Sequence, residues 1–263
     1  MSDPAGRGGQ ELARRYLEQQ QRLGGDAVMP GGRTDLPPAA TGDPSGRPAV
    51  RPAAPPPDLP PPGLSFEPPA GDLFTADPIQ RAATIDAIAD LVRACTRCRL
   101  CEARRHAVPG EGPATARLVV VGEGPGRTED ETGRPFVGQA GELLTKILAA
   151  IDFPRERVFI CNVVKCRPPE NRTPQFDEIQ ACTPYLFRQI ELIAPTVILA
   201  MGGTAAQTLL DTKQSLGALR TKVHRFRGIP VIVTYHPAAL LRNPNWKRPT
   251  WDDVRIARRL LDR

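Results

Sequence analysis

Residues 118–141, LVVVGEGPGRTEDETGRPFVGQAG, are the stretch from which the expected fold of this chain is best derived. Residues 118–121 are apolar and mostly β-branched, which is typical of a buried parallel strand. They run into GEGPG (122–126), a turn tight enough to favour glycine, and a helix is expected to begin near Gln139. In open α/β sheets, ligands bind beyond the carboxyl ends of the strands. We therefore expect the functional site at this loop.

A nucleotide-binding loop is the main alternative for these glycines. The dinucleotide fingerprint requires G-x-G-x-x-G opening into a helix, whereas position 127 is Arg and Pro125 stiffens the turn. No Lys-Ser/Thr pair follows, so a P-loop does not fit either. The pattern instead favours close approach of a flat ligand to the backbone at Gly124, with Phe136 as a stacking face.

Strands and helices alternate along the rest of the chain. Further strands are expected at 158–163, 197–201 and 229–234, and helices at 79–95, 141–151, 174–193, 204–210 and 251–261. Short joins between alternating elements predict a three-layer α/β fold. Its centre should be a four-stranded parallel sheet flanked by helices.

The N-terminal region has a different composition. Of the 30 prolines, those at residues 30–69 are concentrated in a Pro/Gly/Ala-rich segment that extends from 24 to 76. Such a segment cannot bury enough apolar surface to offset its ordering entropy. We expect residues 1–76 to be a disordered arm with a short helix candidate at 9–23, and residues 77–263 to be the folded domain. The partner of the arm is not evident from its sequence.

Composition narrows the function classes. The net charge of +6 and the pI near 9.2 suit a polyanionic partner. No apolar run approaches the roughly 20 residues that span a bilayer, and no secretory leader is evident. We expect a monomeric protein of the cytoplasm, without membrane segments.

Six cysteines suggest a metal centre. Cys95 and Cys98 form a C-x-x-C pair, while Cys166 and Cys182 are separated by fifteen intervening residues. A structural zinc site more often has two tight pairs, and a redox C-x-x-C normally follows a strand rather than preceding it. One tight pair with two distant thiolates suits a [4Fe–4S] cluster. Cys101 extends the pair to C-x-x-C-x-x-C and is a competing ligand.

The motifs resemble those of a known family. GEGPG followed by TGRPFVGQAG is similar to the first motif of the uracil-DNA glycosylase superfamily, in its iron–sulfur family 4, and TYHPAALLRNP (234–244) is similar to the second. The resemblance extends from about Ala94 to the C-terminus. It implies a monofunctional glycosylase that flips uracil out of single- or double-stranded DNA and hydrolyses its N-glycosidic bond, which initiates base-excision repair. It also implies a [4Fe–4S] cluster on Cys95, Cys98, Cys166 and Cys182, and association with the nucleoid when the protein engages DNA.

The resemblance assigns roles to individual residues. Asn162 would read the uracil edge and Phe136 would stack on the flipped base, with Gly124 in the binding loop. His236 would stabilise negative charge on uracil O2. The segment that wedges into the duplex corresponds to Leu240, Leu241 and Arg242. Without the resemblance, each of these residues has an ordinary structural alternative. Asn162 would cap a loop, His236 would be a structural histidine and Phe136 a core residue, and the two leucines would be buried in a helix turn.

The chain departs from the best-known branch of the superfamily. Gly124 and Gly126 replace a water-orienting Asp and an aromatic barrier to thymine, so Glu123 and Glu129 are the candidate catalytic carboxylates. Arg220, with neighbouring basic residues, is a candidate phosphate contact. Two other functions stay open: an Fe–S nucleic-acid-binding module without activity, and a glycosylase for other deaminated bases such as hypoxanthine or xanthine.

Overall fold

The computed structural model describes residues 59–68 and 77–263. The chain divides into two units between residues 59 and 60, and the unit from Pro60 to Arg263 holds all the secondary structure reported below. The helix candidate at 9–23 lies outside the described residues.

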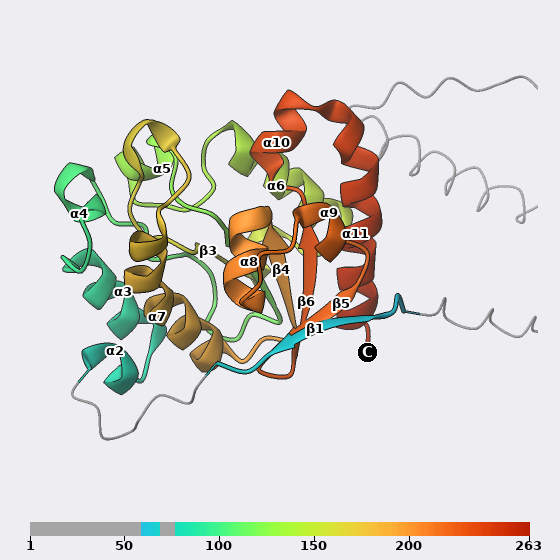
Figure 1. Cartoon of the computed structure of the whole chain (residues 1–263), viewed down its shortest axis with the longest axis horizontal. Helices are drawn as coiled ribbons and strands as arrows, with labels where there is room; N and C mark the ends of the chain where they lie inside the picture. Colours follow the sequence, from blue (N-terminus) through green and yellow to red (C-terminus); the bar gives the residue numbers. More distant parts are fainter. Residues whose placement is uncertain (1–58, 69–76) are drawn as a thin grey trace, which may run out of the picture. The chain divides into compact units, whose positions relative to one another are not determined.

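The centre of this unit is a sheet of six strands in the order β1-β5-β6-β4-β2-β3 (Figure 1). The strands are β1 (Pro62–Phe66), β2 (Leu118–Gly122), β3 (Val158–Asn162), β4 (Val197–Met201), β5 (Val223–Phe226) and β6 (Ile229–Thr234). β6, β4, β2 and β3 pair in parallel and are the four strands expected from the sequence. The α/β fold with a mostly parallel sheet is therefore confirmed.

Helices cover both faces of this sheet. They are α2 (Pro78–Arg81), α3 (Ile85–Arg93), α4 (Leu100–Ala103), α5 (Arg127–Thr132), α6 (Gln139–Ala150), α7 (Phe176–Ile193), α8 (Gly203–Leu210), α9 (Leu216–Leu219), α10 (Pro237–Arg242) and α11 (Lys247–Leu261). Three short 3₁₀ turns are η1 (Arg155–Arg157), η2 (Pro169–Asn171) and η3 (Pro244–Trp246). The helix expected at 79–95 is two helices, because Thr84 caps a new one: its hydroxyl accepts the Ala87 N–H.

Alternation along the buried strands separates the two helical layers. Val119 and Val121 of β2 belong to the core formed with α3, α7 and α8. On the other side, α11 packs against β4 and β6. Every residue of β2, β3 and β4 is buried, and apart from Gly122 and Asn162 at the strand ends these residues are apolar, as expected for a parallel sheet covered on both faces.

Two strands were not expected from the sequence. β5 forms an antiparallel hairpin with β6 through Arg227 and Gly228, both of which have positive φ. β1 pairs in parallel with β5, although it lies inside the segment expected to be disordered up to residue 76. For Pro62–Phe66 that expectation is wrong. Prolines are compatible with an edge strand, and the ring of Phe66 lies 6.2 Å from that of Phe226.

β1 is held by a buried histidine. The Leu64 N–H donates to His224 Nδ1 at 2.8 Å, and His224 Nε2 bonds to the Leu219 carbonyl at 2.7 Å. A Cβ at Gly63 would lie 2.3 Å from the same ring, so only glycine allows the strand to approach so closely.

Within the described residues, no helix is both long and apolar enough to cross a membrane.

Truncation separates the strand from the rest of the N-terminal region. We expect removal of residues 1–58 to leave the thermal midpoint nearly unchanged, because a chain of that composition builds no core. Removal of 1–68 should cost about 1–3 kcal/mol, since it removes the Leu64 hydrogen bond to His224 and the Phe66–Phe226 contact. Gly63→Val should reproduce that loss and Ser65→Ala should not. Equal midpoints for the two truncations would contradict the docking of β1.

Candidate active site

The carboxyl ends of β2 and β3 bring three predicted site residues together. Gly122 and Asn162 are register partners in the sheet. A Cβ at Gly122 would lie 2.4 Å from Asn162 Oδ1 and 2.5 Å from Phe136 Cζ. The glycine is therefore required by close approach, since the amide and the aromatic ring meet over its bare Cα. On the next part of the loop, a Cβ at Gly124 would lie 2.7 Å from Val164 Cγ2.

Asn162 carries an unsatisfied acceptor. Its side chain is 1% exposed, and Oδ1 has no hydrogen-bond partner in the described part of the chain. Leaving a buried acceptor unpaired costs on the order of 1–3 kcal/mol. In a loop-capping asparagine, this oxygen would accept a hydrogen bond from a backbone N–H. The geometry instead suits a ligand that presents an N–H donor.

Phe136 is held in an unusual backbone conformation. Its φ is +50°, which is uncommon for a residue with a side chain. Arg155 donates to the carbonyls of Phe136 (2.8 Å) and Pro135 (2.5 Å). A Cβ at Gly141 would lie 1.9 Å from the Phe136 carbonyl oxygen, so α6 can approach only through glycine. Together these contacts fix the ring beside Gly122, with its centroid 5.4 Å from that of His236.

His236 is the N-cap residue of α10, and its tautomer follows from that position. Nδ1 accepts the Ala238 N–H at 3.2 Å, so in the neutral ring Nε2 carries the proton. Burial, assisted by the nearby charge of Arg242, lowers the pKa of His236 to about 4, while Glu129 acts in the opposite direction. At neutral pH the ring is therefore an uncharged donor.

The two candidate carboxylates have different surroundings. Glu129 is buried, and its Oε1 accepts the N–H groups of Val137 and Gly138, both at 2.9 Å. No described residue donates to its other oxygen, Oε2. Glu123 accepts a 2.5 Å hydrogen bond from Thr204 in the first turn of α8. Glu129 thus holds the loop that carries Phe136 and favours the charged form of His236. Glu123 is instead hydrogen-bonded to α8.

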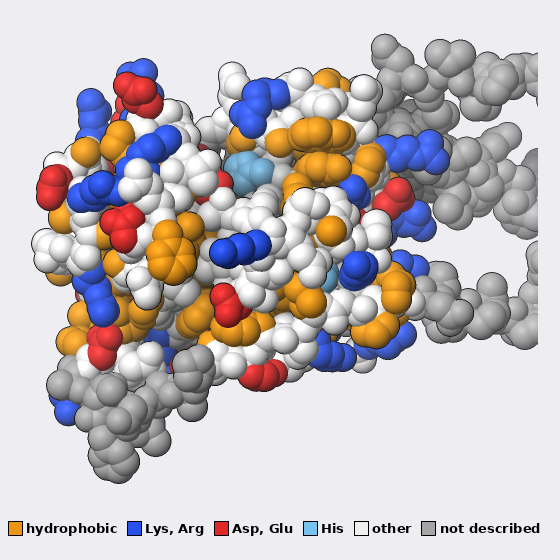
Figure 2. Space-filling model, in the orientation of Figure 1, with side chains coloured by type: hydrophobic (Ala, Val, Ile, Leu, Met, Phe, Trp, Pro, Cys, Tyr) orange, Lys and Arg blue, Asp and Glu red, His pale blue; other side chains and the backbone are white. Residues whose placement is uncertain are grey.

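The segment after His236 presents one leucine to solvent. Leu241 is 47% exposed, whereas Leu240 is 1% exposed and belongs to the core. Trp246, to which the sequence alone assigned no role, is 37% exposed. Its ring stacks on that of Tyr235, with the two ring centroids 4.6 Å apart. Figure 2 shows hydrophobic side chains gathered over α10. Arg242, the basic residue of the predicted inserting segment, is also exposed.

Arg220, a candidate phosphate contact, has a structural role. It forms a 2.7 Å ion pair with buried Asp253 and lies over the Tyr235 ring at 4.4 Å. The sequence gives no sign of this pairing, because the partners are 33 residues apart.

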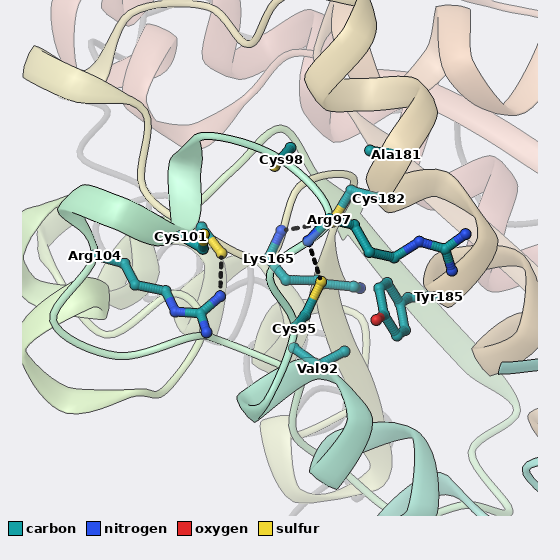
Figure 3. Close-up of a pocket in the computed structure, with 11 residues that line it drawn as sticks. Val92, Cys95, Arg97, Cys98, Cys101, Arg104, Lys165, Ala181, Cys182 and Tyr185 are labelled. Atoms are coloured by element: carbon teal, nitrogen blue, oxygen red, sulfur yellow. Dashed lines mark hydrogen bonds between the residues drawn. The ribbon is translucent and has the colours of Figure 1, made fainter. Parts of the chain in front are cut away.

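The cysteines expected to bind a cluster surround one cavity (Figure 3). Its empty volume is about 280 Å³, and its thiol-bearing residues are Cys95, Cys98, Cys101, Cys166 and Cys182. Arg104 donates to Cys166 Sγ at 3.0 Å, and the backbone N–H of Arg97 and of Lys165 donate to Cys95 and Cys182. Within the described residues, no three metal-binding side chains converge closely enough to share a single ion. The sixth cysteine, Cys161, is instead buried in β3.

The thiols of this cavity fit a cationic metal group. Burial raises the pKa of Cys98 and Cys166, and raises that of Cys182 to about 12. Thiolates at these positions therefore need a compensating positive charge, which iron in a cluster provides. The N–H donors aimed at three sulfur atoms are the kind of contacts that support such ligands.

Comparisons with known proteins agree with this geometry. The family model described as "Uracil DNA glycosylase superfamily" matches residues 109–256. The type-4 uracil-DNA glycosylase of Saccharolobus solfataricus is 45% identical over 186 residues, covering 67% of this chain and 86% of that protein. Those of Thermotoga maritima (45% over 185 residues; 69% and 96%) and Pyrobaculum aerophilum (47% over 163 residues; 59% and 83%) are similarly close.

The lowered pKa of His236 predicts a stability change with pH. The folded state favours the neutral ring, so its contribution is complete above the unfolded pKa of about 6.5 and is lost as pH falls toward about 4. His224, whose pKa is also lowered by burial, adds a change of the same sign. As pH falls, the free energy of unfolding should decrease less steeply in His236→Asn than in the wild type. Asparagine is used because it still caps the helix. Exposed His106→Asn is the control, and an unchanged slope in His236→Asn would contradict the assignment.

Proposed function

Because this chain belongs to the type-4 uracil-DNA glycosylases, which hydrolyse the N-glycosyl bond of uracil in DNA and begin base-excision repair, we propose how its residues divide that work. Asn162 and Phe136 bind the flipped uracil, with the Gly124 loop beside them. His236 stabilises the charge that forms on the leaving base. Glu129 orients water, and Glu123 supports the loop from α8.

The unpaired Oδ1 of Asn162 is the observation that carries this proposal. The N3–H of uracil is a donor that would satisfy it, and the amide NH₂ group suits the adjacent carbonyl oxygen. Cytosine has no N–H at N3, so it would leave the acceptor unpaired. Selection by a buried polar group is strong, because the wrong base leaves that group unsatisfied.

The neutral state of His236 suits its role. Cleavage develops negative charge on the departing uracil, and a preorganised donor is most useful where charge appears only in the transition state. Nδ1 is occupied by the Ala238 N–H, so Nε2–H is the group left to donate. An uncharged ring gives this hydrogen bond without bringing a proton that the reaction must release.

The free Oε2 of Glu129 supports its assignment to water. Oε1 is used by two backbone N–H groups, which hold the carboxylate in one orientation. The influence of Glu129 on the pKa of His236 indicates that the carboxylate faces the same site. A fixed anion there also favours the positive charge that develops on the sugar.

We assign duplex insertion to Leu241 rather than Leu240. An inserted side chain must be available at the surface, and Leu240 is committed to the core. Arg242 follows it, and Lys247 and Arg248 begin α11, so cations flank the exposed apolar group. Flipping costs a few kcal/mol of unstacking, which an inserted side chain and pocket contacts offset. Single-stranded DNA lacks that cost and is also a substrate.

A [4Fe–4S] cluster on Cys95, Cys98, Cys166 and Cys182 completes the proposal. When bound, it acts as a structural cross-link between the segment before α4, the loop after β3 and helix α7. Cys101 lines the same cavity and is half-buried, so it is a neighbour of the ligand set. We further propose that the domain works as a monomer on DNA in the cytoplasm. The partner of the N-terminal arm stays unassigned.

Substitutions should separate the roles at the base. His236→Ala should lower the single-turnover rate of uracil release by roughly 10²–10³ and spare DNA binding. Asn162→Ala should reduce both the rate and the preference for uracil over cytosine. Phe136→Ala should weaken engagement of the flipped base by roughly 1–3 kcal/mol. The product should be an abasic site in an uncut strand. If His236→Ala weakened binding and rate equally, its role would be ground-state binding instead.

Substitution of Leu241 should affect excision, whereas substitution of Leu240 should affect stability. Leu241→Ala should slow excision from duplex DNA more than from single strands and leave the thermal midpoint unchanged. Leu240→Ala should lower the free energy of unfolding by about 2–5 kcal/mol, because it opens a cavity in the core. Equal losses on both DNA forms for Leu241→Ala would argue against insertion.

Iron analysis tests the cluster. Protein purified without oxygen should be brown and carry about four irons per chain. Cys166→Ala should lose the colour, and Cys101→Ala should keep it. Stoichiometric zinc in a colourless, active protein would show that a different metal occupies the cavity.

A further inference from the structure

Among the described residues, Lys165 is the only buried lysine, at 1% exposure. Its Nζ donates to the Asn162 carbonyl at 2.8 Å and to Gln189 Oε1 at 2.7 Å. Gln189 is itself buried and is anchored by its own N–H bond to the Pro109 carbonyl at 2.8 Å. The ammonium group is therefore fixed by two neutral acceptors, and no described carboxylate forms an ion pair with it.

The same residue borders the cysteine cavity (Figure 3). Its backbone N–H donates to Cys182 Sγ at 3.2 Å, and its carbonyl accepts the Val108 N–H at 2.7 Å. Cys166 follows it directly in the chain. A buried cation needs nearby negative charge or full hydrogen bonding. Thiolate ligands in this cavity would supply negative charge near Lys165, whose charge interacts with Cys182.

The chain between the two sites is short and bonded at each step. After Asn162, the N–H of Val163 donates to the Gly122 carbonyl at 2.9 Å and that of Val164 to the Glu123 carbonyl at 3.1 Å. Residues 162–166 thus run from the base-reading amide, along the GEGPG loop, to the cysteine cavity. The side chain of Lys165 reaches back over this segment and holds its first residue.

We propose that Lys165 is a positioning residue that couples the cysteine cavity to the orientation of Asn162. The ammonium group fixes the Asn162 carbonyl, and this restrains the peptide from which the base-reading side chain extends. The inference rests on the proposed role of Asn162. It adds a physical reason for a structural metal group in this enzyme: the thiolates that would hold the group would offset the charge of the ammonium that aligns the base reader.

A purely structural lysine would also matter for folding, so the test needs a readout specific to the base. Lys165→Met removes the ammonium and keeps most of the aliphatic chain. Two DNA probes distinguish the roles: one carries a non-cleavable uracil nucleotide, and the other carries a tetrahydrofuran abasic analogue that has no base to read. Lys146→Met, on the exposed face of α6, is the matched control.

We expect Lys165→Met to retain iron and visible absorbance and to bind the abasic analogue as the wild type does. Uracil excision in single turnover should fall about 10- to 100-fold, the range expected for loss of a charged hydrogen bond. Binding of the uracil probe and preference for uracil over cytosine should fall with it. The double variant Asn162→Ala/Lys165→Met should be no slower than Asn162→Ala, because both changes act on one group.

Additive losses in that double variant, equal weakening on both probes, or wild-type excision by Lys165→Met would each overturn the coupling. If Lys165→Met loses iron, Gln189→Leu decides the question, since it leaves Lys165 and removes one of its two acceptors. A smaller but uracil-specific loss with iron retained supports the proposal, and no loss overturns it. An Asn162→Ala variant with full activity would instead refute the underlying assignment of Asn162.

Discussion

The meeting of the Asn162 amide and the Phe136 ring over the unsubstituted backbone of Gly122 is the constraint on which the site depends. It exists because β2 and β3 pair in parallel and in register, so that the last residues of both strands meet at one edge. Any side chain at Gly122 would displace the amide, the ring or both. The strain at Phe136 and the close approach at Gly141 follow from the same requirement, since the ring must be carried over the end of β2 and held there by Arg155.

The electrostatics of the site are arranged before a substrate arrives. Asn162 Oδ1 is kept unpaired, Glu129 is oriented by two backbone N–H groups, and His236 is neutral because it is buried. The unpaired amide oxygen is unfavourable for folding when taken alone. Each of the three states suits a ligand that brings a donor and then develops negative charge. The surrounding apolar sheet stabilises the fold sufficiently to tolerate them.

A second region, the cysteine cavity, is connected to the first by residues 162–166. Lys165 contacts both regions, and the loop after Cys166 carries Pro168 to within 3.6 Å of the Cβ position of Gly124. A group that holds Cys166 therefore also restrains the binding loop. This arrangement explains how a cluster without a part in bond cleavage would still contribute to the shape of the active site.

The sequence alone predicted the four parallel strands, which the structure confirms, and a loop beyond β2 at which Phe136, Asn162 and His236 come together. These features follow from local apolar runs, glycines and motifs, which are written in contiguous residues. Tertiary structure decided the rest. β1 was hidden because its prolines resemble a linker; pairing with β5, the Leu64–His224 bond and the packing of Phe66 on Phe226 stabilise it. The exposure of Leu241 rather than Leu240, the pairing of Arg220 with Asp253, and the reach of Lys165 to Asn162 depend on burial and on contacts between elements. No local pattern encodes such contacts, because the same residue types would serve equally well as solvent-exposed charges or core leucines until the chain is folded.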